Sequence, residues 1–422
     1  MMIDKTLTND AWRRIFEELP VKERIAELGS FRLTAKQIHK IAKREPRLMT
    51  KFDSREQRPK LLLQPPLTIL PTTNGEYVLL RGDGYLDVPP TQTVETYDAS
   101  KVARLQTIKW SEGIRSEPQA LDTLFMASAL RSFADDDTLQ LTIRGRLRSG
   151  KFDFKFRTDI KEELISVSGV QVEVDSGYEG RKVVIVEAKF GALKSFIVRQ
   201  LYYPYRDLLS NGVSKEIVPI LLVYSNRVYS LYSFKFQRPD EYQSISLVRQ
   251  AHYTLEDLKT LPRLAEFVTS TRRKPPTGIP FPQADDLSKV LDVADILSGG
   301  LADKEEIAER FQVDPRQGDY YANAAAWLGI AEKSKGSFDL TKEGREFNKL
   351  TRIERMERVA DILAQTPGFA EALAAQAGGN PLNLAEIARA IGKNYGLSGT
   401  TAPRRASTVR SWIEYLAGNF RN

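Results

Sequence analysis

The chain has 422 residues, of which 41% are hydrophobic and 28% charged, and its formal net charge is +7 at pH 7. This length indicates several domains, and the modest basic excess is compatible with a nucleic-acid partner without requiring one. Cysteine is absent and only two histidines occur, which excludes disulfides, thiolate metal sites and most histidine-based catalysis. No apolar run is long enough for a membrane span, and residues 1–8 lack the apolar stretch of a signal peptide.

The N-terminal region, residues 1–95, is predicted to contain helices followed by strands. An amphipathic helix over residues 9–19 carries four apolar side chains at i, i+3, i+4 and i+7: Trp12, Ile15, Phe16 and Leu19. Thr34 is expected to begin a second helix with a basic side, which would face either DNA or solvent. Short apolar runs between prolines predict strands and loops over residues 61–90. This region is a candidate for DNA recognition.

Residues 96–270 alternate between helical and strand-like patterns, which predicts an α/β core. A helix over residues 117–133 precedes strand-like runs at 138–146 and 151–157, which we expect to form a hairpin. Four basic residues near its tip are candidates for DNA contact: Arg144, Arg146, Arg148 and Lys151. The elements that follow are two strands, a helix and two strands, over residues 170–175, 182–187, about 193–209, 217–224 and 228–236.

A carboxylate–lysine cluster at the end of two of these strands is the clearest chemical pattern. Glu187 and Lys189 are two residues apart on one strand, so they project from the same side. A turn at Gly177 and Gly180 would pair that strand with the preceding one and bring Asp175 beside Glu187. An isolated Glu-x-Lys triplet is usually a surface ion pair, but the upstream Asp on a paired strand favours a functional site.

This grouping has the parts that phosphodiester hydrolysis needs. A Mg²⁺ ion held by Asp175, Glu187 and the backbone carbonyl of Ala188 would neutralise charge and lower the pKa of bound water. Lys189 would orient that water and stabilise developing charge. Neither cysteine nor histidine is required, in agreement with the composition.

The C-terminal part is predicted to be helical after a Pro-rich linker over residues 271–284. Helices starting near Leu287, Asp303 and Pro315, followed by a hairpin at residues 330–340, predict a winged helix-turn-helix over residues 285–348. Such domains bind DNA or proteins. The third helix carries side chains able to meet phosphates and base edges: Arg316, Gln317, Tyr320 and Asn323.

Residues 349–422 form a second predicted helical unit. Its last helix has an apolar stripe and, on the other side, basic residues that include Arg404 and Arg410. This side would contact phosphates or simply face solvent. The predicted fold class is therefore multidomain α/β (α+β), with a central mixed sheet, a winged helix and a C-terminal helical unit.

The motif Asp175…Glu187-Ala188-Lys189 resembles the PD-(D/E)XK nuclease superfamily, whose core is a hairpin followed by a helix and a strand. Over about residues 10–345 the sequence resembles one group of bacterial type II restriction endonucleases. The segments that carry this resemblance are EVDSGYEG…VIVEAKFG, RQLYYPYR and VPILLVYSN, with EPRLMTKFDS and ILPTTNGEYVLL upstream. Val174 replaces the proline of the motif, which leaves Glu173 and Glu179 as competitors for the first carboxylate.

The resemblance implies Mg²⁺-dependent cleavage of double-stranded DNA at a short specific sequence, leaving 5′-phosphates. It implies Asp175, Glu187 and Lys189 as the catalytic set, in a cytoplasmic bacterial enzyme that acts as a homodimer beside a cognate DNA methyltransferase. Gln200 would correspond to the Gln of a Q-x-x-x-Y motif in related nucleases, although Pro204 occupies the tyrosine position. Alternatives are a repair or structure-specific nuclease with the same core, or a winged-helix transcriptional regulator whose carboxylates are structural.

Overall fold

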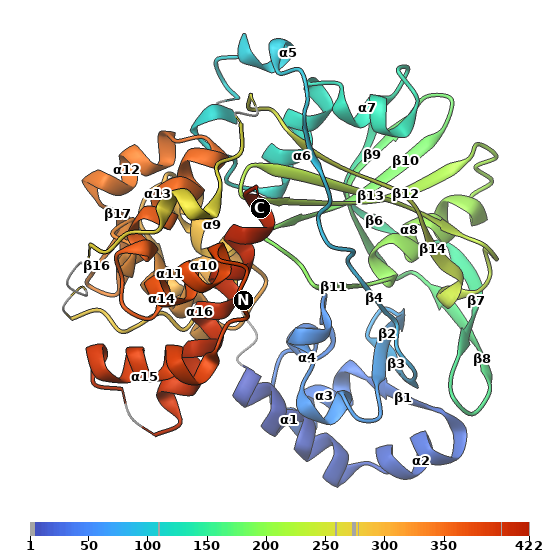
Figure 1. Cartoon of the computed structure of the whole chain (residues 1–422). Helices are drawn as coiled ribbons and strands as arrows, with labels where there is room; N and C mark the ends of the chain where they lie inside the picture. Colours follow the sequence, from blue (N-terminus) through green and yellow to red (C-terminus); the bar gives the residue numbers. More distant parts are fainter. Residues whose placement is uncertain are drawn as a thin grey trace.

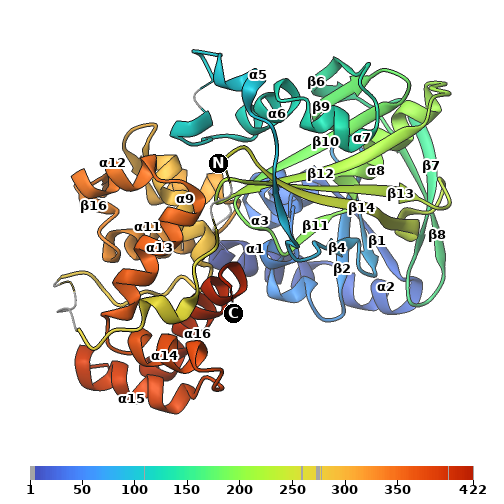
Figure 2. The ribbon, with the colours of Figure 1, turned by 45° about the horizontal axis from the view of Figure 1, so that its top comes forward.

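A computed structural model describes residues 5–108, 110–257, 260–271, 276, 278–397 and 399–421 (Figure 1). In Figure 1 the N-terminal unit lies below the central sheet, and the C-terminal helices pack beside both of them (Figures 1 and 2). Within the described residues, no helix combines the length and apolar character needed to cross a membrane. The fold is mixed α/β, as the alternating patterns predict.

The N-terminal unit combines four helices with a small antiparallel sheet of order β1-β3-β2. The elements are α1 (Lys5–Glu18), α2 (Val21–Leu28), β1 (Ser30–Thr34), α3 (Ala35–Ala42), α4 (Pro46–Thr50), β2 (Leu67–Thr73) and β3 (Glu76–Arg81). Both predicted helices are present, and the Thr34 side chain caps α3 by accepting a hydrogen bond from the Gln37 backbone N–H. Trp12 and Ile15 are fully buried in this unit's core.

The central part is a seven-stranded mixed sheet of order β5-β14-β13-β12-β10-β9-β6. Its strands are β5 (Val94–Thr96), β6 (Gln140–Arg148), β9 (Gln171–Glu179), β10 (Val183–Phe190), β12 (Ile217–Ser225), β13 (Val228–Phe236) and β14 (Ile245–Thr254). β6, β9 and β10 are antiparallel neighbours, and β12 is parallel to β10. The helix α8 (Arg199–Ser210) connects β10 to β12, after the short strand β11 (Ser195–Ile197).

Helices cover both faces of this sheet, as the continuous apolar runs of β10 and β12 require. On one face Val184 and Val186 pack with α6 (Glu117–Met126), α7 (Ala129–Ala134) and the C-terminal helices in one apolar cluster. On the other face Ile185 packs with the tyrosines of α8 and with a separate sheet of β7 (Lys151–Arg157) and β8 (Glu162–Ser168).

Three local predictions for the central part are wrong. The helix expected over residues 117–133 divides into α6 and α7, because Ser128 takes a left-handed conformation with φ of 71°. The expected hairpin at Ser149 does not form: β6 pairs with β9, while β7 pairs with β8. The helix expected from about residue 193 begins at Arg199, because β11 first pairs with β4 (Tyr85–Asp87).

The C-terminal part consists of helices and a three-stranded sheet of order β15-β17-β16. The elements are α9 (Leu287–Leu297), β15 (Ala302–Asp303), α10 (Lys304–Arg310), α11 (Pro315–Trp327), β16 (Ala331–Ser334), β17 (Ser337–Leu340), α12 (Lys342–Lys349), α13 (Arg352–Ala364), α14 (Phe369–Ala377), α15 (Leu384–Tyr395) and α16 (Thr401–Asn419). The capping box of Asp303 and Glu306 and the hairpin β16–β17 form as expected.

The C-terminal part and the central sheet share one apolar core rather than two separate cores. The predicted linker joins them in sequence, but residues 272–275 and 277 of it lie outside the described residues. The tight turn between β12 and β13 carries Asn226 and Arg227, both with positive φ, and their side chains hydrogen bond to α16 and to the α12–α13 region. The central sheet and the C-terminal part are therefore joined by hydrogen bonds as well as by a common core.

Candidate active site

The strands β9 and β10 bring Asp175 to the backbone that follows Glu187. Their ladder starts at Val183 and Glu179 and ends at Val186 and Ser176. Beyond that point Asp175 Oδ2 accepts a hydrogen bond of 2.8 Å from the Ala188 backbone N–H. The β6–β9 register shifts just here, and a bulge of this kind turns a side chain away from its regular direction.

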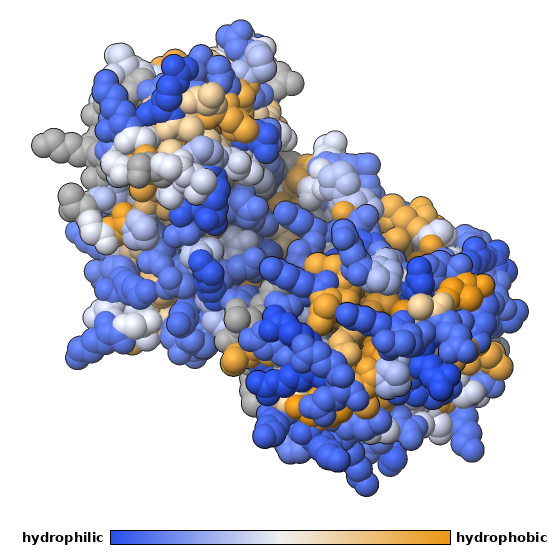
Figure 3. Space-filling view, turned by 90° about the horizontal axis from the view of Figure 1, so that it is seen from below, coloured by the Kyte–Doolittle hydropathy of each residue, from blue (hydrophilic) through white to orange (hydrophobic). Residues whose placement is uncertain are grey.

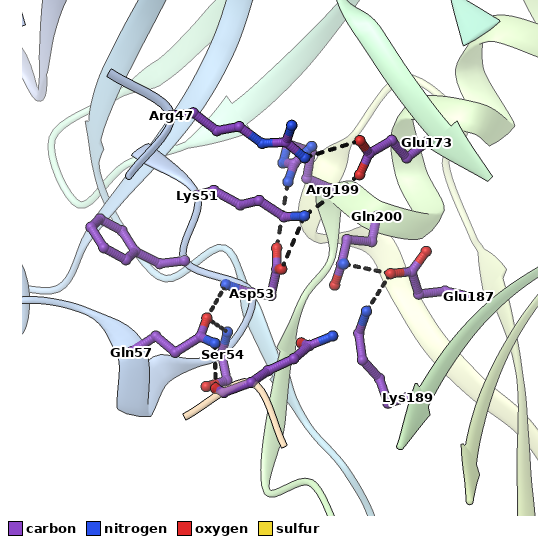
Figure 4. A network of polar contacts seen from close by, with 12 residues as sticks. Arg47, Lys51, Asp53, Ser54, Gln57, Glu173, Glu187, Lys189, Arg199 and Gln200 are labelled. Atoms are coloured by element: carbon purple, nitrogen blue, oxygen red, sulfur yellow. Dashed lines mark hydrogen bonds and ion pairs between the residues drawn. The ribbon is translucent and has the colours of Figure 1, made fainter. Parts of the chain in front are cut away.

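Glu187, Lys189 and Gln200 form a closely bonded group beside Asp175. Lys189 Nζ lies 2.5 Å from Glu187 Oε1, as expected for residues two apart on one strand. Gln200 is the second residue of α8, and its Nε2 donates a hydrogen bond to the same Glu187 oxygen (Figure 4). Glu187 and Lys189 are only 6% and 5% exposed, so these charges are almost completely removed from water.

Burial determines the protonation of this group. Burial raises the pKa of Glu187 to about 8; the Lys189 charge opposes that shift and the Asp175 charge adds to it. Burial also tends to lower the pKa of Lys189, but the carboxylates of Glu187 and Glu117 outweigh it and hold this pKa above its usual value. Lys189 is therefore an ammonium, and the site has more carboxylates than cations.

Glu117 is a further carboxylate of this site that the sequence did not reveal. It is the first residue of α6, and the charges of both Lys189 and Asp175 act on its pKa, which burial raises. The Phe190 backbone N–H acts in the opposite direction and lowers the pKa of Glu117. The sequence contained a weak indication, because Ser116-Glu117-Pro118 is a helix start directly before the β6–β9–β10 strands.

The N-terminal unit contributes Asp53 to the same site (Figure 4). Asp53 is buried, and its charge acts on the pKa values of Glu187 and Lys189. Its Oδ1 has no hydrogen-bond partner among the described residues and lies 3.8 Å from Arg199 Nη2. Gln57 holds this segment by accepting from the Asp53 and Ser54 backbone N–H groups. No local sequence pattern could predict this contact.

The turn before α11 reaches both of these additional carboxylates. The Gln312 carbonyl accepts a hydrogen bond from Gln57 Nε2, and Gln312 Nε2 lies 3.3 Å from Glu117 Oε1. Gln312 itself has a positive φ of 52°, which turns the chain between α10 and α11. The C-terminal part is therefore connected by hydrogen bonds to the surroundings of Glu187 and Lys189.

The donor atoms at this site fit a hard divalent cation. Asp175 and Glu187 supply carboxylate oxygens, which Mg²⁺ prefers. The N–H and C=O of one strand residue point toward the same neighbouring strand, so the Ala188 carbonyl faces β9 as its N–H does. The β9–β10 ladder ends at Val186, before this carbonyl. A cation would also offset the surplus of carboxylates. In the part of the chain that is described, no three His, Cys, Asp or Glu side chains are arranged as a metal-binding group.

A groove of about 1370 Å³ runs between the N-terminal unit and the C-terminal part and passes the site at Asp53. Figure 3 shows the two lobes with mostly hydrophilic residues where they meet. Five of the predicted DNA-contact residues line the groove: Arg146, Arg316, Gln317, Tyr320 and Arg404. Asp175, Glu187 and Lys189 are not among the lining residues.

The remaining predicted DNA contacts lie elsewhere. Arg144 is paired with Asp122 of α6 and Arg410 with Glu414, while Asn323 donates to the Asp319 carbonyl. Arg148 is the last residue of β6 and Lys151 the first residue of β7, and neither lines the groove. The expected cluster of four basic residues is not a single patch, because β6 and β7 belong to different sheets.

The two competitors for the first carboxylate have other partners. Glu179 lies at the far end of the β9–β10 ladder and pairs with Lys215 at 2.6 Å. Glu173 is held by Arg47 and Arg146, each at 3.2 Å, and by Lys51 at 3.5 Å. Neither contacts Glu187 or Lys189 in the structure, whereas Asp175 bonds to the Ala188 N–H between them.

Comparison with known proteins matches three successive parts of the chain to protein families but assigns no activity to any of them. Three protein-family models match, each described only as a domain of unknown function: DUF6996 over residues 9–79, DUF6997 over 80–254 and DUF7226 over 289–420. These limits agree with the N-terminal unit, the central sheet and the C-terminal part. No curated protein and no solved structure matches the chain.

Proposed function

We propose that the protein is a type II restriction endonuclease of the PD-(D/E)XK superfamily, which hydrolyses phosphodiester bonds of double-stranded DNA at a short specific sequence. The observation that carries this proposal is the set of Asp175, in the middle of β9, and the buried Glu187 and Lys189, near the end of β10. Its support is the order of elements: a helix, three antiparallel strands, the helix α8 and the parallel strand β12.

The roles of the residues follow from their contacts. Asp175, Glu187 and the Ala188 carbonyl would hold Mg²⁺, which when bound supplies Lewis acidity and a more acidic water. Lys189 remains protonated, so it orients the attacking water and stabilises charge on the phosphate. Gln200 fixes the Glu187 carboxylate through its Nε2. The products would carry 5′-phosphates, as they do in this superfamily.

The groove supports a role for the C-terminal part in reading the target sequence. The helices α9, α10 and α11 followed by the hairpin β16–β17 have the order of a winged helix-turn-helix, and α11 presents Arg316, Gln317 and Tyr320 to the groove. A homodimer would cut both strands of the duplex, and a cognate methyltransferase would protect the host genome.

Incubation with plasmid DNA and Mg²⁺ tests the proposal. We expect discrete fragments from the wild type and no cleavage by Lys189→Ala, with DNA binding retained. Lys215→Ala is the matched control, because Lys215 is a half-exposed lysine bonded to Glu179 at the other end of β9. Circular dichroism verifies that each variant is folded.

The other outcomes of this experiment would reject the assignment. Cleavage by Lys189→Ala would remove the lysine from the catalytic set. Random nicking or cleavage of branched substrates alone would favour a repair or structure-specific nuclease. Specific binding without any cleavage would favour a transcriptional regulator.

A further inference from the structure

Three cations from separate segments converge on Glu173, outside the catalytic set. Arg47 comes from α4, Lys51 from the residue after it, and Arg146 from β6, where it lies directly opposite Glu173 in the strand register. Arg47 Nη2 is 3.2 Å from Glu173 Oε1, and Lys51 Nζ is 3.5 Å from Oε2 (Figure 4). Arg146 Nε is also 3.2 Å from Oε1. We refer to Arg47, Lys51 and Arg146 as the cation triad.

One carboxylate does not neutralise the cation triad. Three positive charges surround one negative charge, and Lys51 is also 3.7 Å from Asp53, which pairs with Arg199. The triad side chains are 53%, 37% and 66% exposed, and all three line the groove. Ion pairs this exposed contribute little free energy, so an incoming anion would displace Glu173 at small cost.

The position of the cation triad relates it to the proposed catalysis. Glu173 is two residues before Asp175 on β9, which corresponds to about 7 Å along a strand. That spacing resembles the separation of neighbouring phosphates on one DNA strand. Two guanidinium groups and an ammonium are also the donors that bind phosphate oxygens most strongly.

We propose that the cation triad binds the backbone phosphate next to the one that is cut, and that Glu173 occupies this phosphate site until DNA replaces it. This inference rests on the proposed function and extends it to a named contact with the DNA backbone. Glu173 is then a substitute for phosphate rather than a metal ligand.

Equilibrium binding of a fluorescent duplex of mixed sequence, in EDTA and over a range of salt, tests this assignment without requiring cleavage. We expect Arg47→Ala and Lys51→Ala each to weaken binding several-fold and to reduce the salt slope by about 1. Glu173→Gln should have the opposite effect and tighten binding, because it frees the triad for phosphate. Glu179→Gln, the same change on the same strand, should leave affinity unchanged.

The outcomes distinguish this inference from the proposed function. If the wild type never cuts DNA but Glu173→Gln still tightens binding, the nuclease proposal fails and the phosphate site stands. If Glu173→Gln and Glu179→Gln behave alike, the phosphate site is rejected even in an active nuclease. Loss of cleavage by Glu173→Gln with unchanged affinity would make Glu173 a metal ligand. A tightening seen only with 5′-phosphorylated ends would indicate a terminal-phosphate pocket and overturn the backbone assignment.

Discussion

Two of the buried groups of charged side chains in the described part of the chain differ in how their charges are balanced. One is the candidate active site around Glu187 and Lys189. The other lies where the C-terminal part meets the central sheet, around Asp295 and Arg355, which are both completely buried. Burying a charge is costly in either place, so burial alone does not identify a functional site.

The charged groups around Asp295 are matched in number and joined by hydrogen bonds. Arg355 donates to both Asp295 oxygens, at 3.0 and 2.8 Å, and to the Asn348 side chain. Arg227 lies 3.2 Å from Glu256 and 3.8 Å from Asp295. Two arginines therefore face Asp295 and Glu256, while the nearby Asp292 has a pKa raised to about 8 by burial and the Asp295 charge and is neutral at pH 7.

The active-site group lacks this balance. Four carboxyl groups, those of Asp175, Glu187, Glu117 and Asp53, act on the single ammonium of Lys189. Glu187, like Asp292, has a pKa of about 8 and is protonated at pH 7 unless a cation binds beside it. Arg199 and Lys51 lie 3.8 and 3.7 Å from Asp53. A surplus of carboxylates maintained beside a groove has no structural use, and it is what a cation-binding site requires. The difference between the two groups is therefore the excess of carboxyl groups over cations and the position beside the groove that Asp53 lines.

Substitution of Arg355 should have the largest effect on stability. Arg355→Met would leave Asp295 buried without its bidentate partner, so we expect a loss of about 3–5 kcal/mol in the free energy of unfolding. Arg358→Met is the matched control, because Arg358 is an exposed arginine one turn later on α13. Chemical denaturation measures both. Equal effects of the two changes would show that the buried group is not what holds the parts together.

The parts of the site that lie close together in sequence were predictable. Alternation along β10 places Glu187 and Lys189 on one side, and the pairing of β9 with β10 is as predicted. The predicted position of the turn is wrong at Gly177, which lies within the ladder opposite Ile185, because β9 continues to Glu179. Glu117 and Asp53 were missed because they reach the site only through packing of α6 and of the N-terminal unit. No periodicity or spacing encodes such contacts between distant segments.

The wrong predictions have a similar cause. Strand-like runs around Ser149 and Gly150 indicated a hairpin, but their backbone N–H groups bond to the Val170 carbonyl and to the Asp207 carboxylate. Partners distant in sequence therefore replace the local turn. Propensity predicts that a segment is a strand, and it leaves the choice of partner to the tertiary packing.

Mg²⁺ should stabilise the active-site group and leave the balanced group unaffected. If Mg²⁺ binds only the folded protein, a concentration of about 100 times the Kd would add about 2.7 kcal/mol to the free energy of unfolding. We expect Glu187→Gln to abolish that gain, because it removes a ligand oxygen charge. Thermal unfolding with Mg²⁺ and with EDTA measures the difference. A gain that persists in Glu187→Gln would place the cation elsewhere.

Glu179→Gln is the control for this measurement, since it removes a carboxylate of the same strand that pairs with Lys215. It should keep the full Mg²⁺ effect. In the absence of metal, Glu187→Gln should unfold at nearly the same temperature as the wild type. That result would contrast with the destabilisation expected of Arg355→Met. Glu187→Gln removes one of several carboxyl groups, whereas Arg355→Met leaves the buried Asp295 carboxylate without its partner.

The smallest expected effect concerns the pH dependence of the balanced group. Asp292 accepts hydrogen bonds from Ser225 Oγ and the Asn226 N–H, and its pKa rises to about 8 in the folded state from an unfolded value of 3.8. Between these pH values the unfolded chain is ionised and the folded chain is protonated, so this carboxyl lowers stability as pH rises. Asp292→Asn should remove that slope, of at most about 1.4 kcal/mol per pH unit.

The wild type and Asp292→Asn should therefore have similar free energies of unfolding near pH 4. Toward pH 8 the variant should become progressively more stable than the wild type. Denaturation at several pH values measures this, with the exposed Asp361→Asn of α13 as the control. A constant difference between Asp292→Asn and the wild type would mean that Asp292 is ionised throughout. The interface would then carry an unbalanced carboxylate of its own, and excess charge would no longer distinguish the active site from it.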